Sequence, residues 1–313
     1  MLDRREWFGL TLTAATALAI NPRSLFANGA TLIRRAIPRT GEKLPIIGLG
    51  SSATFARVAR SEDVDSLKEV IRTMVSGGAT VLDTAPAYGA SEQVAGDIAR
   101  DLGVTGKIFW ATKVNVAGRG PDAKADPAAA REQIDASFAK FRVPKIDLIQ
   151  VHNLADVSVH LAVLQDLKKA GRVRYTGVTS TSKPQYPRLI EVMRNEPIDF
   201  IGVDYAVDNR DVEETILPLA AERKIGVLVY LPFGRTRLFE RTANPALPAW
   251  AKELGPRTWA QFFLKYVLGH PAVTVVTPAT SKPSHMAENI EAGTGTLPDA
   301  ATRKRMADFI DAL

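Results

Sequence analysis

Short runs rich in Val, Ile and Leu alternate along the chain with longer stretches in which apolar residues recur at helical spacing. Compact runs of this composition are typical of strands covered on both faces. Acidic residues gather near the starts of the longer stretches, where a helix N-terminus favours negative charge. Ser61 and Asp126 are candidate N-caps, and Pro127 suits the first position of a helix.

The order of these segments predicts a parallel sheet with helices outside it. Strands are expected at residues 31–37, 44–49, 80–83, 108–113, 146–151, 173–178, 200–204, 226–231 and 273–277. Helices are expected at residues 61–75, 91–102, 126–141, 157–170, 183–195, 212–223 and 257–268. With 45–49 as the first barrel strand, the pattern predicts an α/β fold, a single (β/α)8 TIM barrel over residues 29–313. An open doubly wound sheet is the alternative; it normally carries a G-x-G-x-x-G turn after its first strand, and residues 48–53 lack the third glycine.

Composition agrees with one globular domain and narrows the chemistry. The chain has 313 residues, of which 46% are hydrophobic and 24% charged, and a barrel of this kind reaches this length as one domain. The net charge of +6 comes from Lys and Arg scattered among acidic residues, so nucleic-acid binding is not indicated. The absence of cysteine excludes disulfides, thiolate zinc sites and cysteine nucleophiles. The four histidines lack metal-ligand spacing, so no metal site is expected.

The N-terminus has the order of an export signal. Arg4 and Arg5 precede an uncharged stretch, residues 7–22, and small residues follow at 27–30. This order predicts a twin-arginine signal peptide over residues 1–28, with the folded protein delivered to the periplasm by the export machinery. The apolar run is short for a mature membrane anchor, so no stable anchor is expected. The alternative is the amphipathic N-terminus of a cytoplasmic protein.

Four polar residues lie where three adjacent predicted strands end. Asp83 ends the strand 80–83 and Tyr88 follows it shortly after, Lys113 ends the strand 108–113, and His152 follows the strand 146–151. Functional residues of such barrels lie at the C-terminal ends of strands. An acid, a tyrosine, a lysine and a histidine are therefore expected to converge on one mouth of the barrel.

This group suits the reduction of a carbonyl, which requires a hydride and a proton for the alkoxide that forms. Tyrosine has an ordinary pKa of about 10, and a nearby ammonium lowers that pKa. Lys113 would therefore make Tyr88 a proton donor and acceptor, Asp83 would pair with Lys113, and His152 would hydrogen-bond the carbonyl. Each residue alone would suggest a structural role, whereas the four in barrel register predict catalysis.

The stretch Asp83-Thr84-Ala85-x-x-Tyr88-Gly89, with Glu92, resembles the signature of the aldo-keto reductase family. The strand ends at Lys113 and at Gln150-Val151-His152 are similar to that family's next two blocks. Further similar blocks lie at residues 177–180, 231–234 and 277–289. The resemblance covers the chain from about residue 33 to its end and implies an NAD(P)-dependent oxidoreductase.

The resemblance also implies cofactor contacts. Tyr230 would stack on the nicotinamide ring, and the positions that usually hold the carboxamide, a Ser-Asn pair and a Gln, are here Thr179, Ser180 and Gly202. The pyrophosphate would lie against residues 232–238, which begin with Pro232. Arg235 and Arg237 are candidate partners for the phosphates, because the guanidinium fork suits phosphate; the alternative is that they are exposed loop arginines without a ligand. Glu288 and Asn289 are expected to contact the adenine end of the cofactor.

The cofactor is expected to be NADP or NAD with weak discrimination. Family members that require NADPH hold its 2′-phosphate with a lysine and an arginine, at positions that are here Ala279 and His285. Thr280, Ser281 and Lys282 can still contact the phosphate, but charge-assisted pairing is reduced at pH 7. NADP binding is expected to strengthen in mild acid, as His285 gains a proton.

Phe55, Val114 and Asn153 are expected to border the substrate pocket, because each neighbours a catalytic strand end. Asn153 stands where many relatives carry tryptophan, which predicts a more open and polar pocket.

The sequence thus predicts an exported enzyme that reduces an aldehyde or ketone with NADP or NAD. An alternative from another class is a nicotinamide-binding accessory or sensing protein with slow turnover, a role that potassium-channel β subunits show for this fold. A third possibility is an exported barrel that uses a retained cofactor for redox-neutral chemistry.

Overall fold

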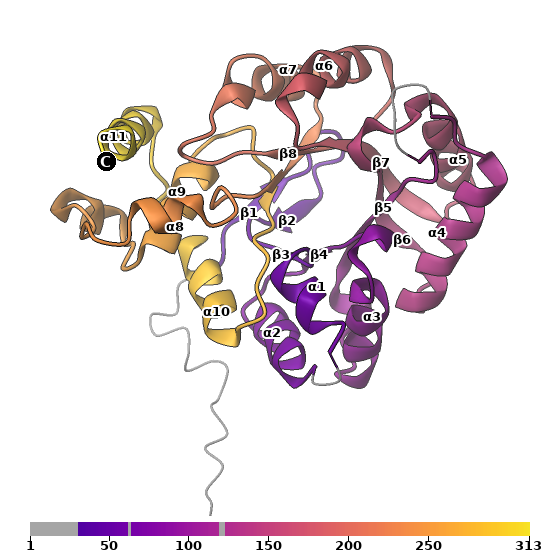
Figure 1. Cartoon of the computed structure of the whole chain (residues 1–313), viewed down its shortest axis with the longest axis horizontal. Coiled ribbons are helices and arrows are strands. Elements are labelled where there is room, and N and C mark those ends of the chain that lie inside the picture. Colours follow the sequence, from indigo (N-terminus) through magenta and orange to yellow (C-terminus); the bar gives the residue numbers. More distant parts are fainter. Residues whose placement is uncertain (1–30, 62–63, 119–122) are drawn as a thin grey trace, which may run out of the picture.

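Eight parallel strands form a barrel that helices surround (Figure 1). The computed structural model describes residues 31–61, 64–118 and 123–313, so the predicted signal peptide lies outside the described residues. Neighbouring strands pair in chain order from first to last. The barrel strands are β3 (Leu49–Gly50), β4 (Val81–Asp83), β5 (Phe109–Val114), β6 (Ile146–Val151), β7 (Val173–Ser180), β8 (Phe200–Asp204), β9 (Gly226–Tyr230) and β10 (Val275–Val276).

The first and last strands of the barrel meet and close it. Parallel bridges join Ile47 to Val276 and Gly50 to Ala279. The amide of Gly48 donates a hydrogen bond to the carbonyl of Val276 at 2.9 Å. A Cβ on Gly48 would lie 2.7 Å from the carbonyl oxygen of Val81 in β4, so this close approach of the backbones requires glycine. The predicted (β/α)8 barrel is confirmed, and the open doubly wound alternative is wrong.

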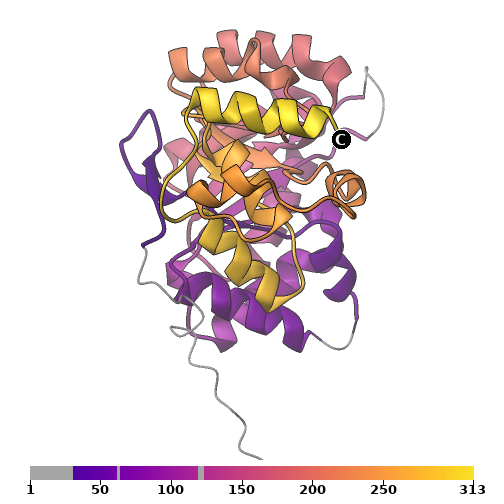
Figure 2. The ribbon, with the colours of Figure 1, turned by 90° about the vertical axis from the view of Figure 1, so that its left-hand side faces the viewer.

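An antiparallel hairpin, β1 (Arg34–Ala36) and β2 (Lys43–Pro45), covers the N-terminal end of the barrel. Its residues Ile37 and Leu44 belong to the same buried cluster as inward-facing strand residues such as Phe109 and Leu228. Figure 2 shows the hairpin on the side of the molecule opposite α8. The predicted strand 44–49 is therefore corrected: its start belongs to the hairpin, and only its end joins the barrel.

The helices pack around the strands, and the larger of the two hydrophobic clusters fills the layer between them. In Figure 1, α8, α9 and α11 gather at one side of the barrel. The helices are α1 (Thr54–Val58), α2 (Asp65–Ser76), α3 (Ser91–Asp101), α4 (Pro127–Phe141), α5 (Val157–Lys169), α6 (Tyr186–Asn195), α7 (Ile216–Glu222), α8 (Arg237–Arg241), α9 (Trp259–Leu268), α10 (Pro283–Ala292) and α11 (Ala300–Asp311). Short 3-10 helices lie at η2 (Pro86–Tyr88), η3 (Thr105–Lys107), η4 (His152–Leu154), η5 (Lys183–Gln185), η6 (Asp211–Glu213) and η7 (Ala249–Leu254).

The predicted N-caps have different outcomes. The carboxylate of Asp126 accepts a hydrogen bond from the amide of Ala128 at 3.0 Å, and Pro127 opens α4, so this helix start is confirmed. Ser61 is not a cap, because α2 begins only at Asp65 and the residue before it is Val64. The Ser61 hydroxyl instead donates to the carbonyl of Val58 at 2.7 Å.

In the part of the chain that the structure describes, none of the helices combines the length and the apolar character needed to cross a bilayer.

Candidate active site

The four predicted catalytic residues meet at the C-terminal end of the barrel. Asp83 is the last residue of β4, and Tyr88 ends the short helix η2 that follows it. Lys113 lies in β5 and pairs in register with Gln150 of β6, two residues before His152. Parallel strands bring their carboxyl ends to one edge, so three neighbouring strands deliver the four side chains to one mouth.

Asp83 and Lys113 form a buried ion pair. The Lys113 ammonium donates to Asp83 Oδ2 at 2.7 Å and to the carbonyl of Thr84 at 2.8 Å. The side chains are 1% exposed for Lys113 and 4% for Asp83. Burial raises the pKa of Asp83 against the opposing effect of Lys113. Although burial alone would lower it, the pKa of Lys113 is raised, because the negative charges of Asp83 and of ionised Tyr88 favour the ammonium. This site therefore holds a fixed positive charge in a place without solvent.

Tyr88 and His152 lie next to this charge. The Lys113 ammonium is 5.1 Å from the centre of the Tyr88 ring. The Tyr88 and His152 rings meet edge to face, with centroids 5.9 Å apart. Burial, and then the charge of Lys113, lowers the pKa of His152 to about 4, so its imidazole is neutral near pH 7. A neutral imidazole can donate a hydrogen bond to a carbonyl without competing with Tyr88 as an acid.

Tyr230, the last residue of β9, reaches across the mouth. Its hydroxyl lies 3.1 Å from Asp83 Oδ1 and 2.8 Å from Gln150 Oε1. Its ring lies beside Gly202 of β8, where a Cβ would approach the Tyr230 hydroxyl to 2.7 Å. Sequence reasoning treated Gly202 only as a lost carboxamide contact and gave Gln150 no role. A glutamine between Ile149 and Val151, just before the strand end at His152, was the signal that could have identified Gln150.

The two hydroxyl groups expected near the carboxamide already have partners. Thr179 Oγ1 accepts a hydrogen bond from the amide of Asn153 at 3.0 Å, which leaves its own proton available to donate. Ser180 Oγ donates to Gln185 Oε1 at 2.9 Å. Of the two, Thr179 is the better donor toward a ligand at the mouth.

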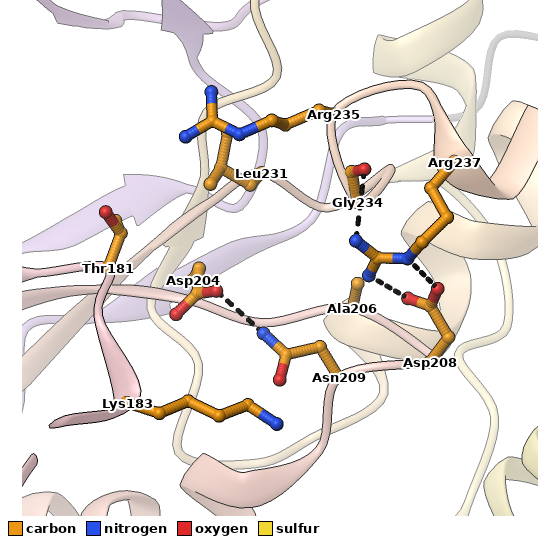
Figure 3. Close-up of a pocket in the computed structure, with 10 residues that line it drawn as sticks. All are labelled: Thr181, Lys183, Asp204, Ala206, Asp208, Asn209, Leu231, Gly234, Arg235 and Arg237. Carbon is orange, nitrogen blue, oxygen red and sulfur yellow. Dashed lines mark hydrogen bonds and ion pairs between the residues drawn. The ribbon is translucent and has the colours of Figure 1, made fainter.

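A polar cavity of about 380 Å³ opens beside these residues, between the loops that follow β7, β8 and β9. Arg237 is committed to Asp208, with contacts of 2.6 and 2.9 Å, whereas no dashed line reaches Arg235 among the residues drawn in Figure 3. Arg235 is thus the better placed of the two arginines for an anion. The cavity is lined by Thr181, Lys183, Asp204, Ala206, Asp208, Asn209, Leu231, Gly234, Arg235 and Arg237.

The closing block lies before and within α10. Thr280 is buried, and its hydroxyl accepts a hydrogen bond from the amide of Lys282 at 3.1 Å. His285 is exposed on α10. Glu288 accepts a hydrogen bond from Thr258, while Asn289 is buried. Pro232 is buried, whereas Ser281 is partly exposed.

Of the residues expected to border the substrate, Asn153 alone has accessible surface at the mouth. Phe55 and Val114 are fully buried in the cluster between strands and helices. Neither residue exposes surface to the mouth in this structure, so their contact with substrate stays a prediction. Asn153 has a φ of 56°, a left-handed conformation that asparagine tolerates better than most residues.

Comparison with known proteins identifies the family. The aldo/keto reductase family model matches residues 46–304. Aldo-keto reductase YhdN of Bacillus subtilis is 31% identical over 201 residues, which span 62% of this chain and 60% of that relative's length. Aldo-keto reductase AKR11C1 of Bacillus halodurans aligns with a TM-score of 0.71 at 23% identity, over 89% of this chain and 96% of that one. An aldo-keto reductase from Klebsiella pneumoniae in complex with NADPH aligns with a TM-score of 0.72 at 20% identity, over 89% and 95%.

At these identities the two structures show the fold alone, whereas the family model covers most of the barrel and its closing block. The chain therefore belongs to the aldo/keto reductase family.

Proposed function

We propose that this protein reduces an aldehyde or ketone with NADPH or NADH, and that Tyr88 is the proton donor. The observation that carries the proposal is the buried Lys113 ammonium, held by Asp83 and 5.1 Å from the Tyr88 ring. A similar fold in complex with NADPH, and another from Klebsiella pneumoniae in complex with NADP and acetate, support the choice of cofactor.

The residues present fit such a cofactor. Tyr230 is partly exposed at the mouth, Thr179 retains a proton to donate, and Arg235 lines the polar cavity with no bond drawn to it. A bound nicotinamide would supply the hydride. Tyr230 would support its ring, and Arg235 would face its phosphates.

The protein's own groups handle the proton. Lys113 stabilises the Tyr88 phenolate, which lowers the cost of giving up the phenolic proton. Neutral His152 donates a hydrogen bond to the substrate oxygen and orients it toward Tyr88. As negative charge develops on that oxygen, the proton moves from the Tyr88 hydroxyl to it, and the alcohol forms.

Replacing Tyr88 by Phe tests this assignment, because the change removes the hydroxyl and keeps the ring. Turnover with a panel of aldehydes should fall about 100-fold or more, while NADPH binding followed by fluorescence should persist. Near-normal carbonyl reduction by Tyr88→Phe would exclude Tyr88 as the proton donor.

A nicotinamide-binding accessory or sensing protein is the second candidate function. It is favoured by the absence of a side chain at Gly202 and by the intramolecular bonds of Ser180, which weaken the expected carboxamide contacts. Steady-state turnover distinguishes the two: an accessory protein would bind the cofactor tightly and reduce every aldehyde slowly. Release of bound ligand from natively purified protein, followed by mass spectrometry, would reveal a retained cofactor.

We further propose that residues 1–28 direct export of the folded protein to the periplasm. The proposal rests on the paired Arg4 and Arg5 before an uncharged stretch. Replacing both arginines by lysine should leave the protein in the cytoplasm with its activity intact. Unchanged fractionation of that variant would exclude a twin-arginine signal.

A further inference from the structure

Tyr230 donates from the opposite side of the barrel to the carboxylate that holds Lys113. Lys113 occupies Asp83 Oδ2 at 2.7 Å, and the Tyr230 hydroxyl faces Asp83 Oδ1 at 3.1 Å. Gln150 offers that hydroxyl a second acceptor at 2.8 Å, and its own amide group donates to the carbonyl of Val178 at 3.3 Å, which fixes its orientation. A phenol has one proton, so Asp83 and Gln150 share it.

Gly202 leaves the space that the Tyr230 side chain occupies when its hydroxyl contacts Asp83. A Cβ at position 202 would lie 2.7 Å from the Tyr230 hydroxyl and 2.8 Å from the carbon that bears it. Both distances are too short for a side chain to coexist with the observed position of Tyr230. The glycine therefore does more than remove a contact, because it allows the phenol to lie against Asp83.

The hydrogen bond from Tyr230 to Asp83 affects the electrostatic environment that Lys113 and Asp83 create next to Tyr88. The Lys113 ammonium lies 5.1 Å from the centre of the Tyr88 ring and 5.1 Å from that of the Tyr230 ring. The ammonium stabilises a Tyr88 phenolate, whereas the negative charge of Asp83 opposes that effect. A hydrogen bond at Asp83 Oδ1 stabilises the carboxylate and draws its charge away from the oxygen that faces Lys113.

We propose that the Tyr230 hydroxyl is a positioning group for proton transfer: reaching Asp83 through the space left by Gly202, it sets how strongly Lys113 acts on Tyr88. Tyr230 itself stays protonated, because burial and the charge of Asp83 raise its pKa well above the ordinary value. The inference rests on the proposed role of Tyr88, and it adds a function of the Tyr230 hydroxyl that is separate from stacking by its ring.

The test replaces Tyr230 by Phe, which keeps the ring. Tyr88 ionisation is followed without cofactor or turnover, as the tyrosinate absorbance lost on Tyr88→Phe in the wild-type and Tyr230→Phe backgrounds. Ionisation should move to higher pH by about half a unit or more, and alcohol oxidation at neutral pH should slow about threefold or more. The Kd for NADPH should stay within about twofold, because the ring remains.

Gly202→Ala provides an independent variant, since its Cβ should push Tyr230 away from Asp83 and produce the same shift with the hydroxyl present. Tyr175→Phe is the matched control: it removes a hydroxyl that contacts Glu42 and Thr40 near the hairpin, and it should leave Tyr88 ionisation unchanged. Unshifted ionisation in Tyr230→Phe overturns the inference even if turnover is normal. A wild-type protein without reductase activity would overturn the proposed function instead, and the absorbance would still decide the inference.

Discussion

The ion pair between Lys113 and Asp83 offsets the cost of burying each charge. The stability of variants therefore depends on whether one partner or both are replaced. Lys113→Met leaves Asp83 as an unpaired buried carboxylate, which should destabilise the fold by about 3–5 kcal/mol in urea unfolding. The double variant Asp83→Asn/Lys113→Met removes both charges and should recover much of that loss. Both proteins should reduce carbonyls poorly, because neither retains the ammonium beside Tyr88.

A double variant no more stable than Lys113→Met would show that the pair contributes through packing rather than charge. The comparison also separates folding from catalysis, since stability should return while activity should not.

Position 279 is expected to control the choice of cofactor. Ala279 offers only a methyl group where the resemblance described above implies a lysine in NADPH-dependent members of the family, and its backbone is fixed by the bridge to Gly50. Ala279→Lys should favour NADPH over NADH by about 1.5–3 kcal/mol, which is roughly tenfold or more. Fluorescence titration with both cofactors measures this preference.

The same titration tests the role of position 285. His285→Lys adds a fixed positive charge to an exposed position of α10 and should strengthen NADPH binding relative to NADH. A strong preference for NADPH in the wild-type protein, unchanged in His285→Lys, would point to Lys282 as the phosphate partner.

The sequence predicted which four side chains meet, because strand ends in a parallel barrel share one edge and the residue types form a coherent proton-transfer group. It did not predict that Tyr230 bonds to Asp83. That contact depends on a cross-barrel distance and on the space above Gly202, and neither appears in a linear pattern.

At the scale of elements, α3 and α4 pack so closely that their contact requires a glycine at position 96 of α3. A Cβ on Gly96 of α3 would lie 2.9 Å from the carbonyl carbon of Lys140 and closer still to its oxygen. In an open helix, Gly→Ala stabilises by up to about 1 kcal/mol. Gly96→Ala should instead lower the thermal midpoint, because backbone cannot give way as a flexible side chain can.

Gly106→Ala is the control for this prediction, since a Cβ at that position would meet no atom within 4 Å. It should leave the thermal midpoint unchanged or slightly raised. Equal effects of the two substitutions would mean that α3 and α4 can separate without cost.

The predicted elements differ from the observed ones for identifiable reasons. The expected helix 212–223 splits into η6 and α7, because Pro218 has no amide proton and is tolerated only near a helix start. The short α1 and α8 lack a full period of apolar residues. α10 and α11 lie beyond the last predicted strand; a (β/α)8 barrel requires one helix there, which the predicted segments left out, and α11 is an addition to that pattern.

At the scale of the whole molecule, two partly buried histidines make the fold sensitive to acid. Burial lowers the pKa of His152 and of His270 to about 4, from an ordinary value of 6.5. Below pH 6.5 the unfolded chain binds protons that the folded chain does not, so this contribution to stability is lost as the pH falls toward 4. His270→Asn keeps an acceptor for the amide of Ala272 and should flatten the dependence.

Urea unfolding midpoints across this range measure the effect as the difference between wild type and His270→Asn. The difference should widen below pH 6.5 in favour of the variant. A constant difference would mean that His270 binds a proton as readily in the folded state as in the unfolded state.

The closure of the barrel also determines when the chain can fold during its synthesis. The Arg35 guanidinium of the hairpin donates to the carbonyl of His270, a partner 235 positions further along the chain. The first barrel strand likewise pairs with the last one. A ribosome must therefore release almost the entire polypeptide before the ring of strands can shut. We therefore expect folding of the barrel to be largely post-translational, with unpaired strand edges exposed until the last strand is released. A circular permutant that joins the hairpin to the segment after Val276 would make these partners local, and it should fold faster than the natural order.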